Sequence, residues 1–148
     1  MAPDMSIPYF FKTVVRFLLS RESITTQGLF RIPGSQDDIQ FYKQLFDQGK
    51  EVHFPHNCSP HDVAGLLKEF LRKMPEPLIP TFYNTQVKFI LDENASKPKD
   101  NPGLLQDLKE VIQQLPKENL VIFEILIKCL GCIVANAHIN MMNVDNII

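Results

Sequence analysis

The chain has 148 residues, of which 45% are hydrophobic, so it is large enough for one domain with a substantial core and too small for two. A formal net charge of −2 excludes a general electrostatic attraction to nucleic acid or anionic membranes. Three cysteines without a secretory signal predict reduced thiols and a cytoplasmic protein. We expect residues 1–6 to be a flexible start or an expression remnant and residues 7–148 to form the domain.

The first predicted helix covers residues 8–20, where apolar side chains recur at helical spacing. Residues 20–23 are polar and are interpreted as a connection. Ser35 and Asp38 then have the spacing of a capping box, and Gly49 is typical of the end of a helix. A second long helix is therefore predicted between Ser35 and Gly49.

Between these helices lies the stretch Gly28-Leu29-Phe30-Arg31-Ile32-Pro33-Gly34-Ser35, whose composition predicts a stiff, sharply folded loop. Gly28 and Gly34 can adopt positive φ angles, and Pro33 fixes its own φ. The apolar residues would pin the loop to a core, which leaves Arg31 as its only charged side chain. An arginine held in this way can be aimed at a ligand, although the loop alone is equally compatible with an arginine that extends into solvent.

The next helix is predicted to start at Ser59 and Pro60 and to run to about Lys73. Lys68 and Arg72 lie four residues apart on its polar side, and like charges at that spacing cost about 0.2–0.5 kcal/mol in an isolated helix. Their placement suggests a role beyond folding, with an ordinary solvated basic face as the alternative. Further helices are predicted over residues 81–91, 102–115 and 117–136, with a mobile surface loop over 92–101 and Asn143 as the N-cap of a last helix.

Two patterns resemble metal sites, and we favour a structural explanation for both. Residues 53–61 contain three histidines and Cys58, but these ligands come from one loop without a second cluster. Cys129 and Cys132 form a Cys-x-x-Cys pair inside an apolar helix, where two small buried residues are the preferred interpretation. We therefore predict no metal site.

Residues 120–137 approach the length of a membrane span. Glu124 and Lys128 lie inside this stretch, however, with the spacing of an ion pair on a helix in water. We therefore predict that this helix is the central buried element of the domain and does not span a membrane.

Four blocks of sequence, taken in order, resemble the RhoGAP family, the GTPase-activating domains for Rho-type G proteins. The blocks are Gly28-Leu29-Phe30-Arg31, then Lys68-x-x-Leu71-Arg72-x-x-Pro75-Glu76-Pro77-Leu78, then Leu115-Pro116 with Asn119, and finally Asn140-x-Met142 ahead of Asn146. One block alone is a weak signal, whereas four in register from about residue 7 to the end of the chain are not expected by chance. The resemblance implies an all-α helical bundle with an arginine-finger loop between the first helices.

The family's activity implies a role for each matching residue. The domain would not be an enzyme itself but would activate GTP hydrolysis by a Rho-, Rac- or Cdc42-like protein in its GTP-bound state. Arg31 would be the finger inserted in trans, Lys68 and Arg72 would brace its loop and face the G protein, Asn146 would contact the G protein, and Pro77 would belong to a strap beneath the loop. The chain has no glycine-rich phosphate loop, so it would need no cofactor of its own, and GTP and Mg²⁺ would be held by the partner. The protein would be cytoplasmic, with recruitment to membranes by its G protein or by flanking domains.

The sequence departs from the family pattern in three ways. Gln27 stands where the family usually has glutamate, and Pro33 where it more often has serine. Helices that normally follow residue 148 are absent, so residues 7–148 are expected to be a domain lacking its last helices, with exposed apolar surface that favours self-association. Truncation and Pro33 favour an alternative, a non-catalytic RhoGAP-fold scaffold that binds a G protein, whereas Arg31 opposes it. The third interpretation is a helical domain with a binding function unrelated to G proteins.

Overall fold

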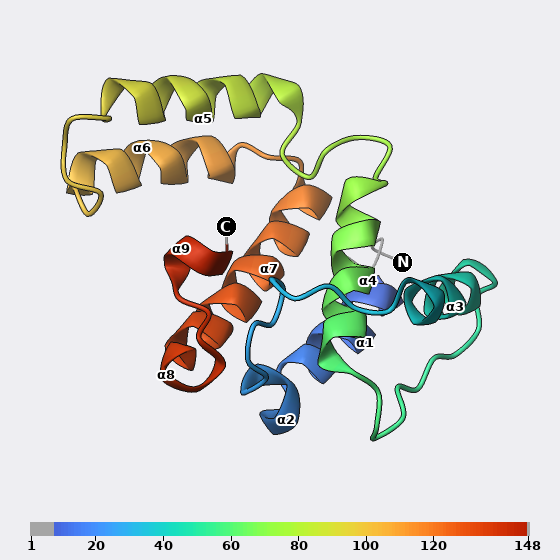
Figure 1. Ribbon diagram of the computed structural model, residues 1–148. Helices are drawn as coiled ribbons and strands as arrows, with labels where there is room; N and C mark the ends of the chain where they lie inside the picture. Colours follow the sequence, from blue (N-terminus) through green and yellow to red (C-terminus); the bar gives the residue numbers. More distant parts are fainter. Residues whose placement is uncertain (1–7, 148) are drawn as a thin grey trace.

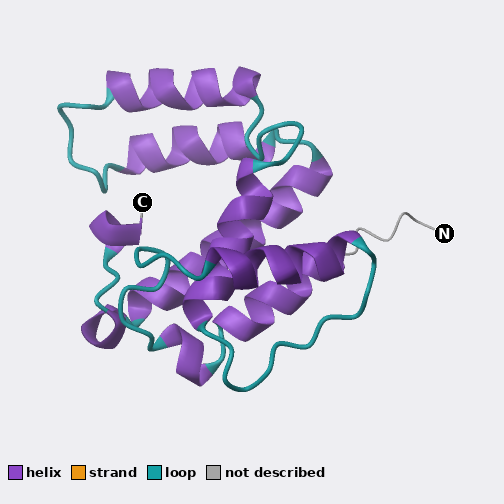
Figure 2. Ribbon diagram, turned by 45° about the vertical axis from the view of Figure 1, so that its right-hand side comes forward, coloured by secondary structure: helices purple, strands orange, loops and turns teal. Residues whose placement is uncertain are grey.

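The computed structural model describes residues 8–147, and every regular element in that range is an α-helix. In chain order the helices are α1 (Tyr9–Leu18), α2 (Arg21–Ile24), α3 (Gln36–Asp47), α4 (Pro60–Arg72), α5 (Thr81–Glu93), α6 (Pro102–Gln113), α7 (Lys117–Ala135), α8 (Ala137–Asn140) and α9 (Val144–Ile147). Figures 1 and 2 show a central group of crossing helices, with a hairpin of α5 and α6 to one side. The predicted all-α fold is confirmed, and the loop that carries Arg31 lies between α2 and α3.

The core forms where α1 packs against both α4 and α7, and α3 packs on α4 (Figure 1). The helical spacing of the apolar residues explains this packing, since Phe11, Val14 and Leu18 of α1 all point into the core and have no exposed surface. The arginine loop contributes Leu29, which is also completely buried. Burial of a leucine side chain contributes about 1.5–3 kcal/mol, so Leu29 anchors the loop two residues before Arg31.

Serine side chains cap the starts of α2, α3 and α4. Ser20, Ser35 and Ser59 each accept a hydrogen bond from a backbone N–H two or three residues later, over 3.3–3.4 Å. The interpretation of residues 20–23 as a plain connection is wrong, because the Ser20 cap allows the next four residues to close a helical turn. The short helix α8 was not predicted either, because its four residues are too few to show a periodicity.

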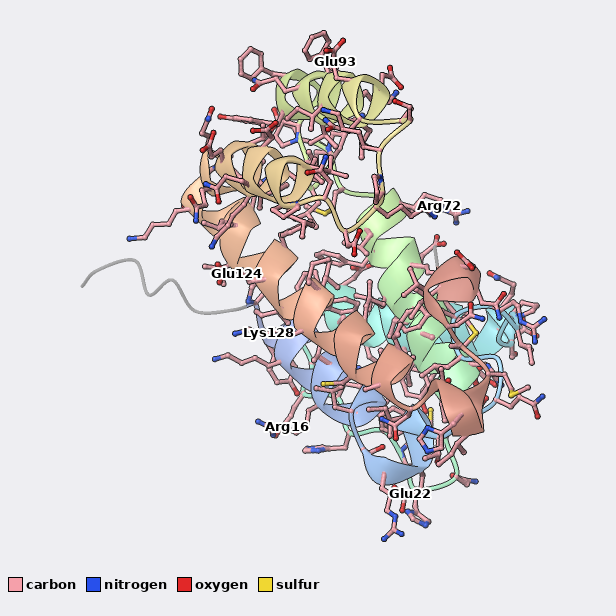
Figure 3. All side chains as sticks on the ribbon, turned by 90° about the vertical axis from the view of Figure 1, so that its left-hand side faces the viewer. Arg16, Glu22, Arg72, Glu93, Glu124 and Lys128 are labelled. Carbon is pink, nitrogen blue, oxygen red and sulfur yellow. The ribbon has the colours of Figure 1, made fainter. Side chains whose placement is uncertain are left out.

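Helix α7 is less buried than predicted. Its side chains at Leu126, Cys129 and Ile133 are buried, whereas Ile127 is 51% exposed. The helices with the most contacts to α7 are α1, α8 and α9, and several of its other side chains are only half-buried. Glu124 and Lys128 lie on one side of α7 (Figure 3), but no ion pair joins them in the described part of the chain. Within residues 8–147 no helix is long and apolar enough to cross a membrane.

Helices α5 and α6 pack on each other and add no residue to the central core. Helix α5 has no fully buried side chain, and Phe82 and Phe89 are 68% and 66% exposed. These two residues are seven positions apart, so they lie on one stripe of the helix. The hairpin therefore carries a large share of the exposed apolar surface of the molecule.

Candidate functional site

The loop between α2 and α3 is a tight series of turns that leaves Arg31 exposed. The backbone N–H groups of Arg31 and Ile32 both donate to the carbonyl oxygen of Gly28, at 2.8 and 2.9 Å. Gly28 has a φ of +73°, and a Cβ at that position would lie 2.5 Å from Cδ1 of Ile32. Glycine is therefore required at the base of the loop, both for its backbone angle and for space.

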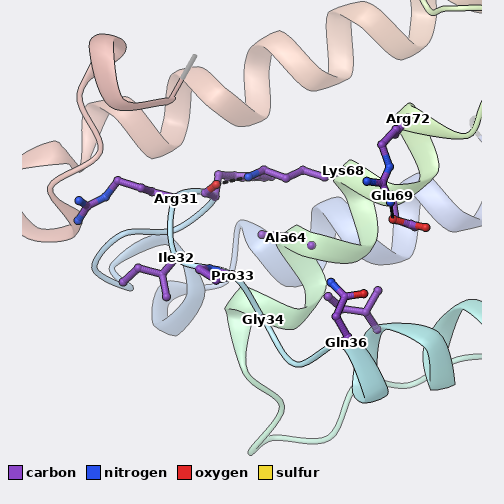
Figure 4. Close-up of a pocket in the computed structure, with 12 residues that line it drawn as sticks. Arg31, Ile32, Pro33, Gly34, Gln36, Ala64, Lys68, Glu69 and Arg72 are labelled. Carbon is purple, nitrogen blue, oxygen red and sulfur yellow. Dashed lines mark hydrogen bonds and ion pairs between the residues drawn. The ribbon is translucent and has the colours of Figure 1, made fainter.

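Phe30 lies in the left-handed region as well, with a φ of +74°. Such a conformation costs about 1–3 kcal/mol for a residue with a side chain, so neighbouring contacts must maintain it. The side chain of Lys68 donates a hydrogen bond to the carbonyl oxygen of Phe30 (Figure 4). The strained residue comes directly before Arg31, and sequence reasoning missed it because nothing about phenylalanine indicates a positive φ.

Gly34 has a different purpose from the one predicted. Its φ is not positive; instead, a Cβ there would lie 2.6 Å from Oδ1 of Asp62 and 2.7 Å from the Asp62 backbone. This closeness lets the N–H of Ser35 donate to the same Asp62 oxygen at 2.7 Å. Asp62 is buried in the first turn of α4, and it thereby ties the downstream end of the arginine loop to that helix.

Replacing Gly34 with alanine should destabilise the domain by about 1–3 kcal/mol, because the new methyl group would push the loop away from the α4 backbone. Gly131 is the matched control: a Cβ there meets nothing within 4 Å, and it lies inside α7. Gly131→Ala should stabilise the domain by up to about 1 kcal/mol through helix propensity. Urea unfolding of both variants measures the difference. Equal effects at the two positions would show that the contact with Asp62 is unimportant.

Lys68 and Arg72 lie on the exposed side of α4, as predicted, but they have different partners. Lys68 reaches the arginine loop, whereas the guanidinium of Arg72 pairs with the carboxylate of Glu69 on its own helix (Figure 4). Lys73 also binds Glu69, with 3.1 Å between Nζ and Oε1. The Glu69 side chain is 9% exposed, so this carboxylate is a largely buried anchor for two cations.

The hydrogen bond from Lys73, assisted by the charge of Arg72, lowers the pKa of Glu69 below its ordinary value of 4.5, although burial opposes the shift. A lowered pKa in the folded state means that Glu69 stabilises the fold above about pH 4.5 and that this contribution is lost as the pH falls through the folded pKa. We expect Glu69→Gln to lower the unfolding free energy at pH 7 and to flatten its pH dependence below pH 4.5. Urea unfolding from pH 3 to pH 7 measures this. Parallel profiles for the two proteins would contradict it.

A buried asparagine holds the upstream end of the arginine loop. Asn140 has no exposed surface, and its Nδ2 donates to the carbonyl oxygens of Ile24 and Ile133, both at 2.8 Å. Its Oδ1 accepts from the N–H of Met142, and its backbone oxygen accepts from the N–H of Gly28, again at 2.8 Å each. Asn140 appears in the sequence only as part of a block without an assigned role, because its partners are up to 116 residues away along the chain.

Asn146 belongs to α9 and lies beside the arginine loop. Its N–H donates to Oδ1 of Asn143 at 2.9 Å, so Asn143 is the predicted cap of α9. The side-chain amide of Asn146 donates to the carbonyl oxygen of Met141, also at 2.9 Å. Asn146 and Asn143 line one hollow together with Arg31 and Gln27, and its volume is about 480 Å³.

Arg31 therefore stands between two hollows. The second has a volume of about 290 Å³ and is lined by the arginine loop and by Lys68, Glu69 and Arg72 of α4 (Figure 4). Arg31 lines both hollows, so Lys68 and Arg72 share one hollow with it and Asn146 shares the other. Pro77 lies in neither hollow and is exposed in the connection between α4 and α5. This connection is held at Leu78, whose carbonyl oxygen accepts a 2.8 Å hydrogen bond from the side-chain amide of Asn119.

The patterns that resembled metal sites do not assemble one. Within residues 8–147 no group of three or more histidine, cysteine, aspartate or glutamate side chains could hold a metal ion. Burial, with the neighbouring Cys132, raises the pKa of the Cys129 thiol to about 11, which disfavours the thiolate that a metal requires. Cys132 is exposed, so the prediction that both cysteines are buried is correct for Cys129 alone.

Residues 8–148 match the sequence family described as the RhoGAP domain. The chain belongs to this family. It is 35% identical over 141 residues to Rho GTPase-activating protein gacY of Dictyostelium discoideum, covering 95% of this chain and 19% of that protein. It is 28% identical over 148 residues to Rho GTPase-activating protein 35 of Canis lupus familiaris, covering 99% of this chain and 10% of the relative. This RhoGAP domain thus spans a tenth to a fifth of the length of these curated relatives.

Solved structures agree with this assignment. The crystal structure of human Rho GTPase activating protein 15 superposes with a TM-score of 0.82 at 28% identity, over 92% of this chain and 63% of that one. The BH domain from GRAF, the GTPase regulator associated with focal adhesion kinase, superposes with a TM-score of 0.77 at 25% identity, over 93% of this chain and 71% of that one. The arrangement of helices around the arginine loop is therefore that of RhoGAP and BH domains.

Proposed function

We propose that this RhoGAP domain accelerates GTP hydrolysis by a Rho-family G protein and that Arg31 is the arginine it inserts in trans. The observation that carries the proposal is the geometry of the loop: Arg31 is exposed, while the backbone on both sides of it is fixed. Asn140 and Leu29 hold the upstream side, and Asp62 holds the downstream side. A side chain on such a rigid base can enter a partner's site without losing much loop entropy.

The chemistry of GTP hydrolysis explains why an arginine is needed. Negative charge spreads over the transferred phosphoryl group and the leaving oxygen, and a cation in a water-excluded site stabilises that distribution. The planar guanidinium of Arg31 offers several N–H donors and can bridge two oxygens at a fixed geometry, which a freely rotating ammonium group does not provide. GTP and Mg²⁺ belong to the G protein in this proposal, and the RhoGAP domain contributes the arginine without a cofactor of its own.

We assign the other residues of this surface to binding. Lys68 keeps the strained Phe30 in place through its hydrogen bond, so it braces the finger loop from α4. Arg72 and Asn146 border the two hollows beside Arg31 and are proposed to contact the G protein there. Gly28 and Gly34 shape the loop, whereas Pro77 is proposed only to shape the connection after α4. The protein is proposed to act in the cytoplasm, where Rho-, Rac- or Cdc42-like partners would recruit it to membranes.

Single-turnover GTP hydrolysis by a panel of Rho-family G proteins tests the proposal. Each G protein is loaded with GTP and mixed with excess RhoGAP domain, and the rate is compared with that of the G protein alone. Acceleration of at least one member supports the activity and ranks the partners. Binding is measured separately with a G protein that holds a non-hydrolysable GTP analogue. Binding without acceleration would favour the alternative hypothesis of a non-catalytic scaffold.

Self-association through apolar surface remains a proposal. Exposed apolar side chains gather on the α5–α6 hairpin and on the last helices, among them Phe82, Phe89, Ile139 and Val144. Sedimentation velocity over a concentration series should show a reversible increase in mean mass, and Phe82→Ser with Phe89→Ser should reduce it. A constant monomer mass up to millimolar concentration would contradict the proposal.

A further inference from the structure

A pocket of about 640 Å³ lies away from the arginine loop, between the start of α1 and the ends of α3 and α4. We call it the aromatic pocket, because Tyr9, Phe10, Phe46 and Phe70 line it together with Leu66, Met74 and Pro75. Its size and the aromatic and aliphatic side chains in its lining are typical of sites that bind small organic molecules, and five charged residues also line it. Nothing in the proposed GTPase-activating mechanism uses it.

The aromatic side chains form a preorganised wall. The rings of Phe10 and Phe70 are stacked, with 4.5 Å between centroids and 17° between planes, and Phe46 meets Phe10 edge-on at 4.9 Å. Tyr9 is fixed through its hydroxyl, which accepts a 3.0 Å hydrogen bond from the N–H of Val52. Phe10, Phe46 and Phe70 are only partly buried, so their apolar surface remains available to a ligand.

Three lysines and two carboxylates line the aromatic pocket, so one positive charge is not balanced. Lys43 pairs with Asp47 at 2.6 Å, and Lys73 pairs with Glu69 at 3.1 Å. Lys50 also lines the pocket, and it makes no ion pair in the part of the chain that the structure describes. Both carboxylates that line the pocket are thus neutralised by lysines, and the remaining ammonium group favours an anion.

We propose that the aromatic pocket binds a small amphiphile with a flat or chain-like apolar body and a single anionic group. The body would lie against Phe10, Phe46 and Phe70, and the anionic group would pair with Lys50. The aromatic pocket shares one lining residue, Glu69, with the hollow of about 290 Å³ beside Arg31. A ligand in the aromatic pocket would therefore leave the exposed side of α4 free. The proposal does not depend on the GTPase-activating activity.

Two fluorescent probes with the same aromatic body separate the roles of the wall and the lysine. One is 1-anilinonaphthalene-8-sulfonate, which carries one negative charge, and the other is neutral N-phenyl-1-naphthylamine. We expect both to bind saturably with one site per chain. Lys50→Gln should weaken binding of the sulfonate by about 1.5- to fivefold, which is the range of one exposed ion pair, and should leave binding of the neutral probe unchanged. A sulfonate affinity that is indifferent to Lys50→Gln would overturn the assignment of the anionic group.

Controls locate the bound probe. Exposed phenylalanines on α5 could also attract it, so Phe82→Ser with Phe89→Ser is measured in parallel and should not change the affinity of either probe. The amide NMR signals of Gly49 and Lys50 and the methyl signal of Met74 should shift on addition of the sulfonate, whereas the signals of α5 should not. Loss of binding in the α5 variant, shifts confined to α5, or absence of saturable binding would each refute the pocket. Arg31→Ala should bind both probes normally, so a failed GTPase assay and a failed pocket assay have different meanings.

Discussion

Arg31→Ala should reduce the stimulated rate of GTP hydrolysis by about 10³-fold or more, since an arginine supplied in trans contributes about 10³–10⁵ in rate to reactions of this class. The loss should appear in the maximal single-turnover rate rather than in the affinity for the GTP-bound G protein. The reason is that the guanidinium stabilises charge that develops only in the transition state. Rapid-mixing measurements at saturating RhoGAP domain separate the two quantities.

Two further variants make this result specific. Arg31→Lys keeps the charge but loses the planar fork of donors, so it should recover little of the rate. Arg16→Ala removes an exposed arginine from α1 that lies in neither hollow beside Arg31, and it should retain the full rate. Because Arg31 is exposed, its replacement should change the unfolding free energy by no more than about 0.5 kcal/mol. Full stimulation by Arg31→Ala would remove Arg31 from the mechanism.

Asn140→Ala should have the largest effect on stability. It leaves the carbonyl oxygen of Ile24 and the N–H of Met142 without the side-chain partner that now satisfies them, and it removes one of the two hydrogen bonds to the carbonyl oxygen of Ile133. Each unsatisfied buried group costs about 1–3 kcal/mol, and the side chain also leaves a small cavity, so we expect a total loss of about 3–5 kcal/mol. Urea denaturation at 25 °C measures this change in unfolding free energy.

The consequences of this variant should extend to the arginine loop. The backbone oxygen of Asn140 accepts from Gly28, so displacement of residues 140–142 would release the upstream side of the loop. Amide hydrogen exchange at Gly28 should therefore accelerate more than exchange within α4. Asn136→Ala is the control, because Asn136 directly follows α7 and its side-chain amide donates to the Cys132 carbonyl oxygen four residues earlier, so the change should cost less than about 1 kcal/mol. Similar losses of unfolding free energy in the two variants would show that the buried hydrogen bonds of Asn140 add no particular stability.

Local sequence patterns were enough to predict the long helices and to single out the exposed arginine. Helical spacing of apolar residues, serine caps and prolines act over a few residues, so they place α1, α3, α4, α5, α6 and α7 to within one or two residues. The order of four short blocks was enough to indicate the family, which the match over residues 8–148 then confirmed. Lys68 and Arg72 were assigned correctly to the exposed side of α4, because a helical wheel needs no tertiary information.

The way in which the arginine loop is held depends on contacts between distant segments. Asp62 and Asn140 bind groups that lie 27 or more residues away in the sequence. The left-handed backbone of Phe30 is held by a hydrogen bond from Lys68 of α4. Gly34 is needed for a close approach to α4 rather than for its backbone angle. The exposure of α7 likewise depends on which neighbours cover it and not on its own hydrophobicity. Local patterns record what a segment prefers, whereas buried polar bonds and close contacts exist only once distant segments meet, and that is why they could not be predicted from the sequence.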